Sequence, residues 1–265
     1  MLTVLDIRQK GDIMTKKAVE NQETFSSGER LVELKRKADD LRIDKKYLDA
    51  IPLYEDVVKK QTSALGENHE NTLNTRYLLA LCYFEQNDYQ KALPIFQDVA
   101  EKRTLTLGKD HEDTLITRNG LARCYYQQND YQKAIPLFRD VYDKQTFTLG
   151  ENHANTLNTR YWLASCYYRQ NDYQKAIPIF QDVDDKQTFT LGENHVNTLD
   201  TRYWLAQCYY EQNDYHKAAP IFQDVAEKQT STLGENHVNT LDTRYWLALC
   251  YFEQKDYQKK KPCRY

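Results

Sequence analysis

The stretch FTLGENHANTLNTRYWLASCYYRQNDYQKAIPIFQDVDDKQT (residues 147–188) is followed directly by a near copy of itself, Phe189–Thr230, which differs at eight of 42 positions. The same period continues in both directions, with histidine at 69, 111, 153, 195 and 237 and cysteine at 82, 124, 166, 208 and 250. A fixed period of this length is typical of stacked supersecondary units, none of which buries its apolar face alone. The sequence therefore predicts one elongated repeat array.

Each unit contains two segments with helical periodicity. In Thr72–Gln86 the apolar residues recur every three or four positions, which predicts a first helix, called helix A. Asp88 is the predicted N-cap of a second helix, called helix B, which runs from Tyr89 to about Leu107. Gly108 is expected to end helix B in a left-handed conformation. The predicted fold class is therefore all-α, a solenoid of antiparallel helix pairs.

The array is expected to span residues 29–257, as five helix pairs followed by a sixth helix A. The first unit is degenerate, with a strongly charged helix A near residues 29–41. The sixth helix A, residues 240–254, is complete, but the residues after it lack the apolar face of a helix B. Residues 1–28 are polar and aperiodic and are expected to be disordered, and residues 258–265 are expected to form a basic tail.

The composition excludes several classes of protein. The chain has 36 Lys and Arg against 39 Asp and Glu, a net charge of −3, which does not favour nucleic acid or a membrane surface as partner. No run approaches the roughly 18 apolar residues of a membrane helix, and the first residues turn charged before a signal-peptide core could form. Repeat-equivalent cysteines on helices about 8–10 Å apart cannot form disulfides. They are expected to be buried packing groups in a reducing cytoplasm.

A series of small and aromatic positions resembles the consensus of the tetratricopeptide repeat: Leu79, Ala80, Tyr83, Tyr89, Ala92 and Phe96. The 42-residue period, the Leu-Gly-Glu-Asn-His loop and Pro94 after Lys91-Ala92-Leu93 resemble the kinesin-light-chain subtype of that family. The resemblance implies a right-handed superhelix of antiparallel helix pairs. It also implies that the A helices line a concave groove in which peptide segments bind.

The sequence departs from that subtype in two places. Residues 1–28 carry no heptads, so membership of a kinesin complex is not expected. The paired Asn that the family often carries before the Leu-Ala of helix A are Tyr161-Trp162, Tyr203-Trp204 and Tyr245-Trp246 here, and Asn119 alone keeps one Asn. The expected groove is therefore more aromatic than that of the family.

On helix A, positions equivalent to 158, 161, 165, 168 and 169 fall on one stripe, and the resemblance implies that this stripe faces the groove. The stripe carries a first row of side chains, Tyr77, Asn119, Tyr161, Tyr203 and Tyr245. A second row is formed by Phe84, Tyr126, Tyr168, Tyr210 and Phe252. Tyrosine is a common interface residue; the alternative is that these rings only pack against one another between repeats.

Charge along the stripe is uneven, with Arg123 and Arg169 in the middle and Asp200, Glu211, Asp242 and Glu253 toward the C-terminal end. This predicts a bound peptide with acidic residues at the middle of the groove and basic residues at its C-terminal end. The alternative is that the differences between units are only free sequence variation at exposed positions. The candidate peptide-groove residues are Tyr77, Asn119, Arg123, Tyr161, Trp162, Arg169, Tyr203, Trp204, Glu211, Tyr245 and Trp246.

Two further repeated residues are given structural roles. The arginines at 76, 118, 160, 202 and 244 are expected to pair with the repeated aspartates at 98, 140, 182 and 224. Each repeated histidine precedes its cysteine by 13 residues, about 20 Å along a helix, which is too far to share a metal ion. The histidines are instead expected to bond the backbone at the start of helix A.

No catalytic motif or phosphate-binding loop occurs, so neither enzyme activity nor a metal or cofactor is expected. The expectation is a cytoplasmic, non-catalytic scaffold that binds a peptide or disordered segment of a partner protein. The alternatives are a homodimer formed through the last helix A, a sensor fragment of a larger multidomain protein, and a binder of single-stranded RNA through stacked tyrosines. The acidic end of the stripe argues against RNA.

Overall fold

The computed structural model describes residues 28–260, with side chains described as far as Lys255. The predicted disordered segment, apart from its last residue, lies outside the described residues, in 1–27. The end of the predicted basic tail, residues 261–265, also lies outside them. The chain divides after Thr106 into two compact units, and each is described by itself. All the regular secondary structure in the described range is helical.

The N-terminal unit contains a helix over residues 28–43 followed by α2 (Tyr47–Leu65), α3 (Glu70–Glu85) and α4 (Tyr89–Thr106). The first helix packs on α2, where the hydroxyl of Tyr54 donates a hydrogen bond to Asp39 at 2.6 Å. Ala50, Tyr54 and Val57 of α2 are fully buried, as are Ala92, Phe96 and Val99 of α4. This confirms that the charged first pair follows the plan of the later repeats.

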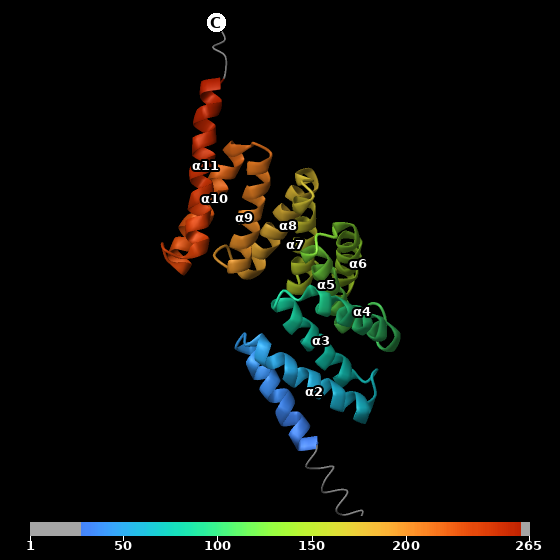
Figure 1. Ribbon diagram of the computed structural model, residues 1–265. Helices are drawn as coiled ribbons and strands as arrows, with labels where there is room; N and C mark the ends of the chain where they lie inside the picture. The colour runs from blue at the N-terminus through green and yellow to red at the C-terminus, as the bar shows by residue number, and fades with distance from the viewer. Residues whose placement is uncertain (1–27, 261–265) are drawn as a thin grey trace, which may run out of the picture. The chain divides into compact units, whose positions relative to one another are not determined.

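The C-terminal unit contains seven helices in the described range: α5 (Glu112–Gln127), α6 (Tyr131–Leu149), α7 (Ala154–Arg169), α8 (Tyr173–Leu191), α9 (Val196–Glu211), α10 (Tyr215–Leu233) and α11 (Val238–Lys260). Consecutive helices lie antiparallel and in contact (Figure 1), and A helices also touch across repeats, α5 with α7 and α7 with α9. Among all the described helices, none combines the length and the apolar surface that a bilayer crossing requires.

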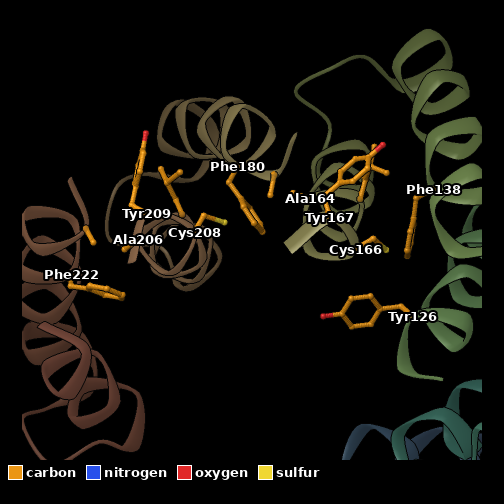
Figure 2. Packing of buried hydrophobic residues seen from close by; sticks show 14 of the residues in the cluster. Tyr126, Phe138, Ala164, Cys166, Tyr167, Phe180, Ala206, Cys208, Tyr209 and Phe222 are labelled. Carbon is orange, nitrogen blue, oxygen red and sulfur yellow. The ribbon is translucent and has the colours of Figure 1, made fainter. Parts of the chain in front are cut away.

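The core of the C-terminal unit is built from one phenylalanine of each B helix and small residues of the A helices. Phe138, Phe180 and Phe222 are fully buried in one cluster with Cys166 and Cys208, as Figure 2 shows. Burial raises the pKa of both thiols to about 12, so they remain protonated packing groups. The predicted packing role of the repeated cysteines is confirmed, and all five are free.

The repeated histidine begins each A helix as an N-cap. At α7, the Nδ1 atom of His153 accepts a hydrogen bond from the backbone N–H of Asn155 at 3.2 Å, and the same contact recurs at His69, His111, His195 and His237. Such a cap satisfies one of the backbone N–H groups that a helix start leaves without a partner. The predicted role of the histidines is therefore confirmed.

The turn between helices A and B depends on asparagine, and the loop after helix B depends on glycine. Asn171 has a φ of 60°, and its counterparts in the other complete repeats are similar, so this residue occupies the left-handed region. Gly150 has a φ of 94° and a ψ of 157°, a region that is essentially restricted to glycine. The predicted stop at Gly108 has the expected positive φ, 98°, but its counterpart Gly150 is extended and not left-handed helical.

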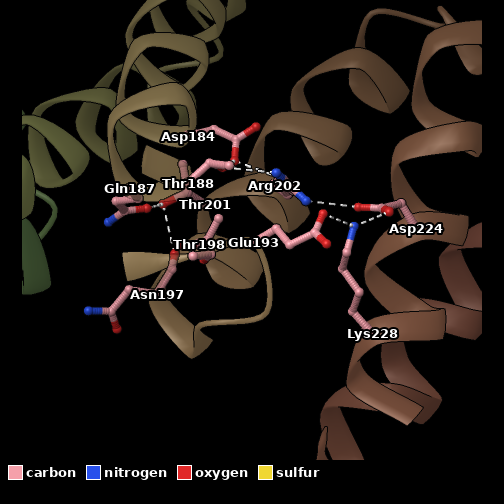
Figure 3. A network of polar contacts seen from close by, with 11 residues as sticks. Asp184, Gln187, Thr188, Glu193, Asn197, Thr198, Thr201, Arg202, Asp224 and Lys228 are labelled. Carbon is pink, nitrogen blue, oxygen red and sulfur yellow. Dashed lines mark hydrogen bonds and ion pairs between the residues drawn. The ribbon is translucent and has the colours of Figure 1, made fainter. Parts of the chain in front are cut away.

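The predicted Arg–Asp pairs join helix A to helix B within each complete pair. The guanidinium–carboxylate distance is 2.6 Å for Arg76–Asp98 and Arg118–Asp140, 2.8 Å for Arg160–Asp182 and 3.0 Å for Arg202–Asp224. Figure 3 shows Arg202 between Asp184 and Asp224, with Lys228 bridging Asp224 to Glu193 of the preceding loop. These networks fix the crossing of the two helices.

The last helix differs from the prediction, because α11 continues to Lys260 where its helix A was expected to end near Gln254. Lys255 stands at the position where Asn213 leaves α9 in the left-handed region. Asparagine tolerates that region better than lysine does. The residues after Lys255 also bring no apolar face, since Lys260 replaces the buried Ala218.

Lysine does not by itself prevent the turn. Lys45, which precedes α2, adopts a φ of 60°. There the following helix buries Ala50 and Tyr54, and this packing offsets the backbone cost. The continuation of α11 therefore has two causes. The asparagine of the turn is missing, and no following helix with an apolar face is available to pack and offset the cost of the turn.

Candidate functional site

Two pockets with the same construction open one repeat apart in the C-terminal unit. The first, called the α7–α9 pocket, has a volume of about 160 Å³ and is lined by residues of α7, α8 and α9. The second, called the α9–α11 pocket, has a volume of about 580 Å³ and is lined by residues of α9, α10 and α11. Every residue that lines the α7–α9 pocket has its 42-residue counterpart in the α9–α11 pocket. The pocket is therefore a property of the repeat.

Each pocket lies between two consecutive A helices and the end of the B helix that joins them. In the α9–α11 pocket, Asp200 and Tyr203 come from α9, Gln229 from α10, and Asn239 and Asp242 from α11. The corresponding residues of the α7–α9 pocket are Asn158, Tyr161, Gln187, Asn197 and Asp200. Asp200 thus lines both pockets.

Tyrosine–aspartate hydrogen bonds link the walls of each pocket. The hydroxyl of Tyr161 donates to Oδ2 of Asp200, and that of Tyr203 donates to Oδ2 of Asp242, each at 2.6 Å. Desolvation and then the nearby Asp200 carboxylate raise the pKa of Tyr161, so its hydroxyl stays a donor. Desolvation also raises the pKa of the Asp200 carboxyl, against the hydrogen bonds that Tyr161 and Trp204 donate to it.

A buried glutamine forms the floor of each pocket. Gln187 is 5% exposed and Gln229 is 6% exposed. Their Oε1 atoms accept hydrogen bonds from the hydroxyls of Thr201 and Thr243, at 2.7 and 2.8 Å. The Gln187 contact with Thr201 is drawn in Figure 3. Each glutamine therefore ties helix B to the next A helix through its oxygen.

The first row of predicted groove residues is half-buried at every position except Tyr245. Tyr161 and Tyr203 pack edge-on against Phe180 and Phe222, with ring centroids 5.7 Å apart. Asn119 donates through Nδ2 to the Thr159 hydroxyl at 2.7 Å and so joins α5 to α7. Two more members of the row lie elsewhere: Tyr77 packs on Phe96 in the N-terminal unit, and Tyr245 on α11 is 58% exposed.

The second row packs between repeats through the tryptophans. Tyr126 meets Trp162, Tyr168 meets Trp204 and Tyr210 meets Trp246, with centroid distances of 5.2, 5.1 and 5.0 Å. Each such pair contributes about 0.5–1.5 kcal/mol beyond the area that it buries. These rings therefore hold consecutive A helices together.

The predicted arginines of the stripe lie against these rings. The Arg123 guanidinium is 5.1 Å from the Trp162 ring centroid. That of Arg169 is 5.9 Å from the Trp204 centroid, and its Nε donates to the Tyr126 hydroxyl at 3.1 Å. The stripe of residues on the A helices is called the A-helix face below. Its middle is cationic and aromatic, because Arg123 and Arg169 lie over tryptophan rings, while Glu211 is exposed at the end of α9.

The glutamine floor and the wall residues Asn197 and Asn239 were not predicted from the sequence, whereas Asn158 lies on the predicted stripe. The glutamines at 61, 145, 187 and 229 follow the buried valine of α2, α6, α8 and α10 by four positions, so they lie on the apolar face; α4 has Arg103 at this position. A polar residue repeated on an apolar face is the signal that could have revealed them. In the part of the chain that the structure describes, no group of three or more His, Cys, Asp or Glu could hold a metal ion.

Comparison with known proteins identifies the family. A tetratricopeptide repeat model matches residues 31–104, 96–146 and 197–259, and a second tetratricopeptide repeat model matches residues 159–186. The first model alone covers more than half of the chain, so the chain belongs to the tetratricopeptide repeat family. No curated protein sequence matches it.

Comparison with solved structures indicates which subtype of tetratricopeptide repeat the chain contains. A putative kinesin light chain from Podosopora anserina with nearly identical repeats is 26% identical, with a TM-score of 0.67 over 77% of this chain and 96% of that one. BtubC (BKLC) from P. vanneervenii is 15% identical, with a TM-score of 0.66 over 83% and 87%. The quorum sensor NprR from B. thuringiensis is 14% identical, with a TM-score of 0.69 over 98% and 71%. The repeats are of the kinesin-light-chain-like type, and the last two structures share the fold.

Proposed function

We propose that this protein is a non-catalytic scaffold that binds an extended segment of a partner protein along the A helices of its C-terminal unit, as a kinesin-light-chain-like adaptor. The observation that carries this proposal is the pair of equivalent pockets on α7, α9 and α11. An extended chain presents side chains at regular intervals, and a surface with regularly spaced pockets is suited to receive them.

The charges on the A-helix face support a fixed direction for the bound segment. Arg123 and Arg169 lie over tryptophan rings at the middle, whereas Asp200, Asp242 and the exposed Glu211 lie toward the end of the array. Acidic residues of the partner segment are therefore placed at the middle and basic residues at the C-terminal end.

We assign the binding module to residues 29–257 and place it in the cytoplasm. Five buried free thiols, one per repeat, fit a compartment in which cysteines stay reduced. Neither nucleic acid nor a membrane is assigned as a partner, in keeping with the net charge of −3.

A random peptide display library tests the proposal, with the parent protein compared with a variant whose pockets are filled. Thr190 and Thr232 are exposed residues that line the two pockets, so a Thr190→Trp/Thr232→Trp double variant blocks them without touching the core. Ser231→Trp is the matched control, because Ser231 is exposed and lines neither pocket. Peptides that bind the parent and the control but not the double variant support the proposal. Absence of enrichment, or equal binding to all three, contradicts it.

A second candidate function is self-association through α11. Its outer face exposes Leu241, Tyr245 and Phe252, which are 50%, 58% and 60% exposed. A second copy of the chain could cover this face in an isologous dimer. Light scattering across a dilution series distinguishes this candidate: a dimer dissociates on dilution, and a monomer at all concentrations excludes it.

A further inference from the structure

The two aspartates of the pockets differ from the other repeated aspartates of the chain. Asp182 and Asp224 on the B helices pair with Arg160 and Arg202 at 2.8 and 3.0 Å. Asp200 and Asp242 make no ion pair with any described lysine or arginine. Their described side-chain partners are neutral, such as the hydroxyls of Tyr161 and Tyr203. Neither pocket is lined by a lysine or an arginine.

Each carboxylate keeps acceptor capacity for a further partner. A carboxylate offers about four lone-pair sites; the tyrosine uses one of them, and at Asp200 the indole of Trp204 uses a second. Asp200 and Asp242 are also exposed residues, so a cation from another molecule can reach them. The α9–α11 pocket has such a carboxylate on two walls, whereas the α7–α9 pocket has Asn158 in place of one.

The floor of the pocket points independently to a peptide ligand. Gln229 is nine-tenths buried and uses Oε1 on Thr243, but its Nε2 group donates to no residue in the described part of the chain. The same holds for Gln187 and Thr201. The Nε2 group of each glutamine is therefore a free donor at the floor of an open pocket, and the carbonyl groups of a peptide backbone offer it an acceptor in every residue.

We infer that the α7–α9 and α9–α11 pockets bind two basic side chains of one extended peptide, with Asp200 and Asp242 as counter-ions and the Nε2 groups of Gln187 and Gln229 as donors to its backbone carbonyls. This inference rests on the proposed function and adds the chemistry of the ligand. The larger pocket, with two carboxylates, takes an arginine, whose planar guanidinium reaches two acceptors at once.

The spacing of the pockets sets the spacing of the basic residues. Consecutive A helices touch, and packed helices lie about 8–10 Å apart. An extended or polyproline-type chain advances about 3.1–3.4 Å per residue. Two basic residues three positions apart therefore match the two pockets.

Fluorescence anisotropy with synthetic peptides tests the inference. The probe is a labelled peptide of otherwise neutral polar residues with arginines three positions apart, and its control has citrulline, a neutral isostere, in place of both. The arginine peptide is expected to bind about tenfold or more tightly than the citrulline peptide, since hydrogen bonds to charged groups are the stronger ones. A peptide with arginines six positions apart is expected to bind more weakly than the first.

Protein variants assign the effect to the pockets. Asp242→Asn keeps an acceptor for Tyr203 and is expected to lose about tenfold in affinity for the arginine peptide and none for the citrulline peptide. Glu235→Gln removes the same charge from the nearby loop and is the matched control. Asn158→Asp gives the smaller pocket its second carboxylate and is expected to strengthen binding of the arginine peptide several-fold. Circular dichroism verifies that each variant is folded.

The outcomes separate the inference from the proposed function. Equal binding of the arginine and citrulline peptides, or equal losses in Asp242→Asn and Glu235→Gln, overturns the inference and leaves peptide binding intact. The display library could instead yield neutral or acidic peptides that bind the parent but not the Thr190→Trp/Thr232→Trp variant. In that case the proposed function holds, and the inference of a basic ligand is wrong. If folded protein binds no peptide of any charge, both are wrong.

Discussion

Helices α9 and α11 have nearly the same sequence and very different surroundings. Over the 16 residues of α9 the two differ only at Gln207, which is Leu249 in α11, and at Tyr210, which is Phe252. Yet Leu199 is 3% exposed and its counterpart Leu241 is 50% exposed. In this array burial is therefore decided by the next repeat and not by the residue, as expected of a solenoid whose units contact only their neighbours.

The comparison also explains why the candidate site lies where it does. A pocket requires two A helices and the B helix between them, so α9 has a pocket on each side. Helix α11 forms one wall of the last pocket, and its own outer face has no further A helix in the described residues. The end of the array thus has apolar surface on the outer face of α11 and carboxylate-lined pockets on the two sides of α9.

The largest expected effect comes from deleting the same side chain in the two helices. Leu199→Ala is expected to lower the free energy of unfolding by about 2–5 kcal/mol, because it opens a cavity in a packed core. Leu241→Ala is expected to cost less than about 1 kcal/mol, because half of that side chain is already exposed. Chemical denaturation of the two variants measures the difference. Equal costs would show that α11 is covered in solution, as a dimer requires.

The turn after helix A provides the second test. Asn213→Val is expected to cost about 1–2 kcal/mol, because a β-branched residue would have to adopt the left-handed conformation there. Lys255→Val is expected to cost far less, because Lys255 lies within α11 and has no such constraint. The free energies of unfolding decide this, and a similar penalty at both positions would mean that α11 turns after Gln254.

Thiol reactivity gives a third comparison. Burial raises the pKa of Cys208 to about 12 and that of Cys250 to about 11, and both are fully buried. Because only the thiolate reacts, both are expected to resist iodoacetamide near pH 8 and to react once the protein unfolds. Cys250 is expected to react first, since α11 has neighbours on one side only. Peptide mass spectrometry resolves the sites, and faster labelling of Cys208 would reverse the proposed order of stability.

The smallest effect concerns pH. Since desolvation raises the pKa of Asp200, its carboxylate gains a proton at a higher pH than an ordinary aspartate does. Binding of the arginine peptide requires the ionised carboxylate, so the affinity for this peptide is expected to be highest at neutral pH and to fall on acidification. Anisotropy titrations measure the midpoint of this loss. Asp200→Asn should move that midpoint to lower pH, whereas His111→Asn, which keeps an N-cap and lines neither pocket, should not.

The fold could be predicted largely because its determinants recur at fixed positions. The N-cap role of His153 and the pairing of Arg202 with Asp224 both follow from residues that are close in the sequence or fixed by the period. The end of α11 could not be predicted in this way, since Lys45 makes the turn and Lys255 does not. That difference depends on whether a packed helix follows.

The site was only partly predictable for a related reason. Tyr161 and Tyr203 were recognised from the stripe on helix A, and each does line a pocket. Gln187 and Gln229 were missed, because a pocket formed by three helices requires the register between them. The same register shows that the tyrosines pack on Phe180 and Phe222. Replacing them with alanine would therefore damage the core as well as the surface.

Hydrogen–deuterium exchange with a peptide enriched from the library tests the central claim most directly, because it locates the peptide on the folded protein. The account predicts slower exchange on peptide binding in residues 194–204 and 229–243, which contain the residues that line the α9–α11 pocket, and in their counterparts one repeat earlier. Protection confined to the outer face of α11, around Tyr245 and Phe252, would contradict it and favour self-association or capture at the end of the array.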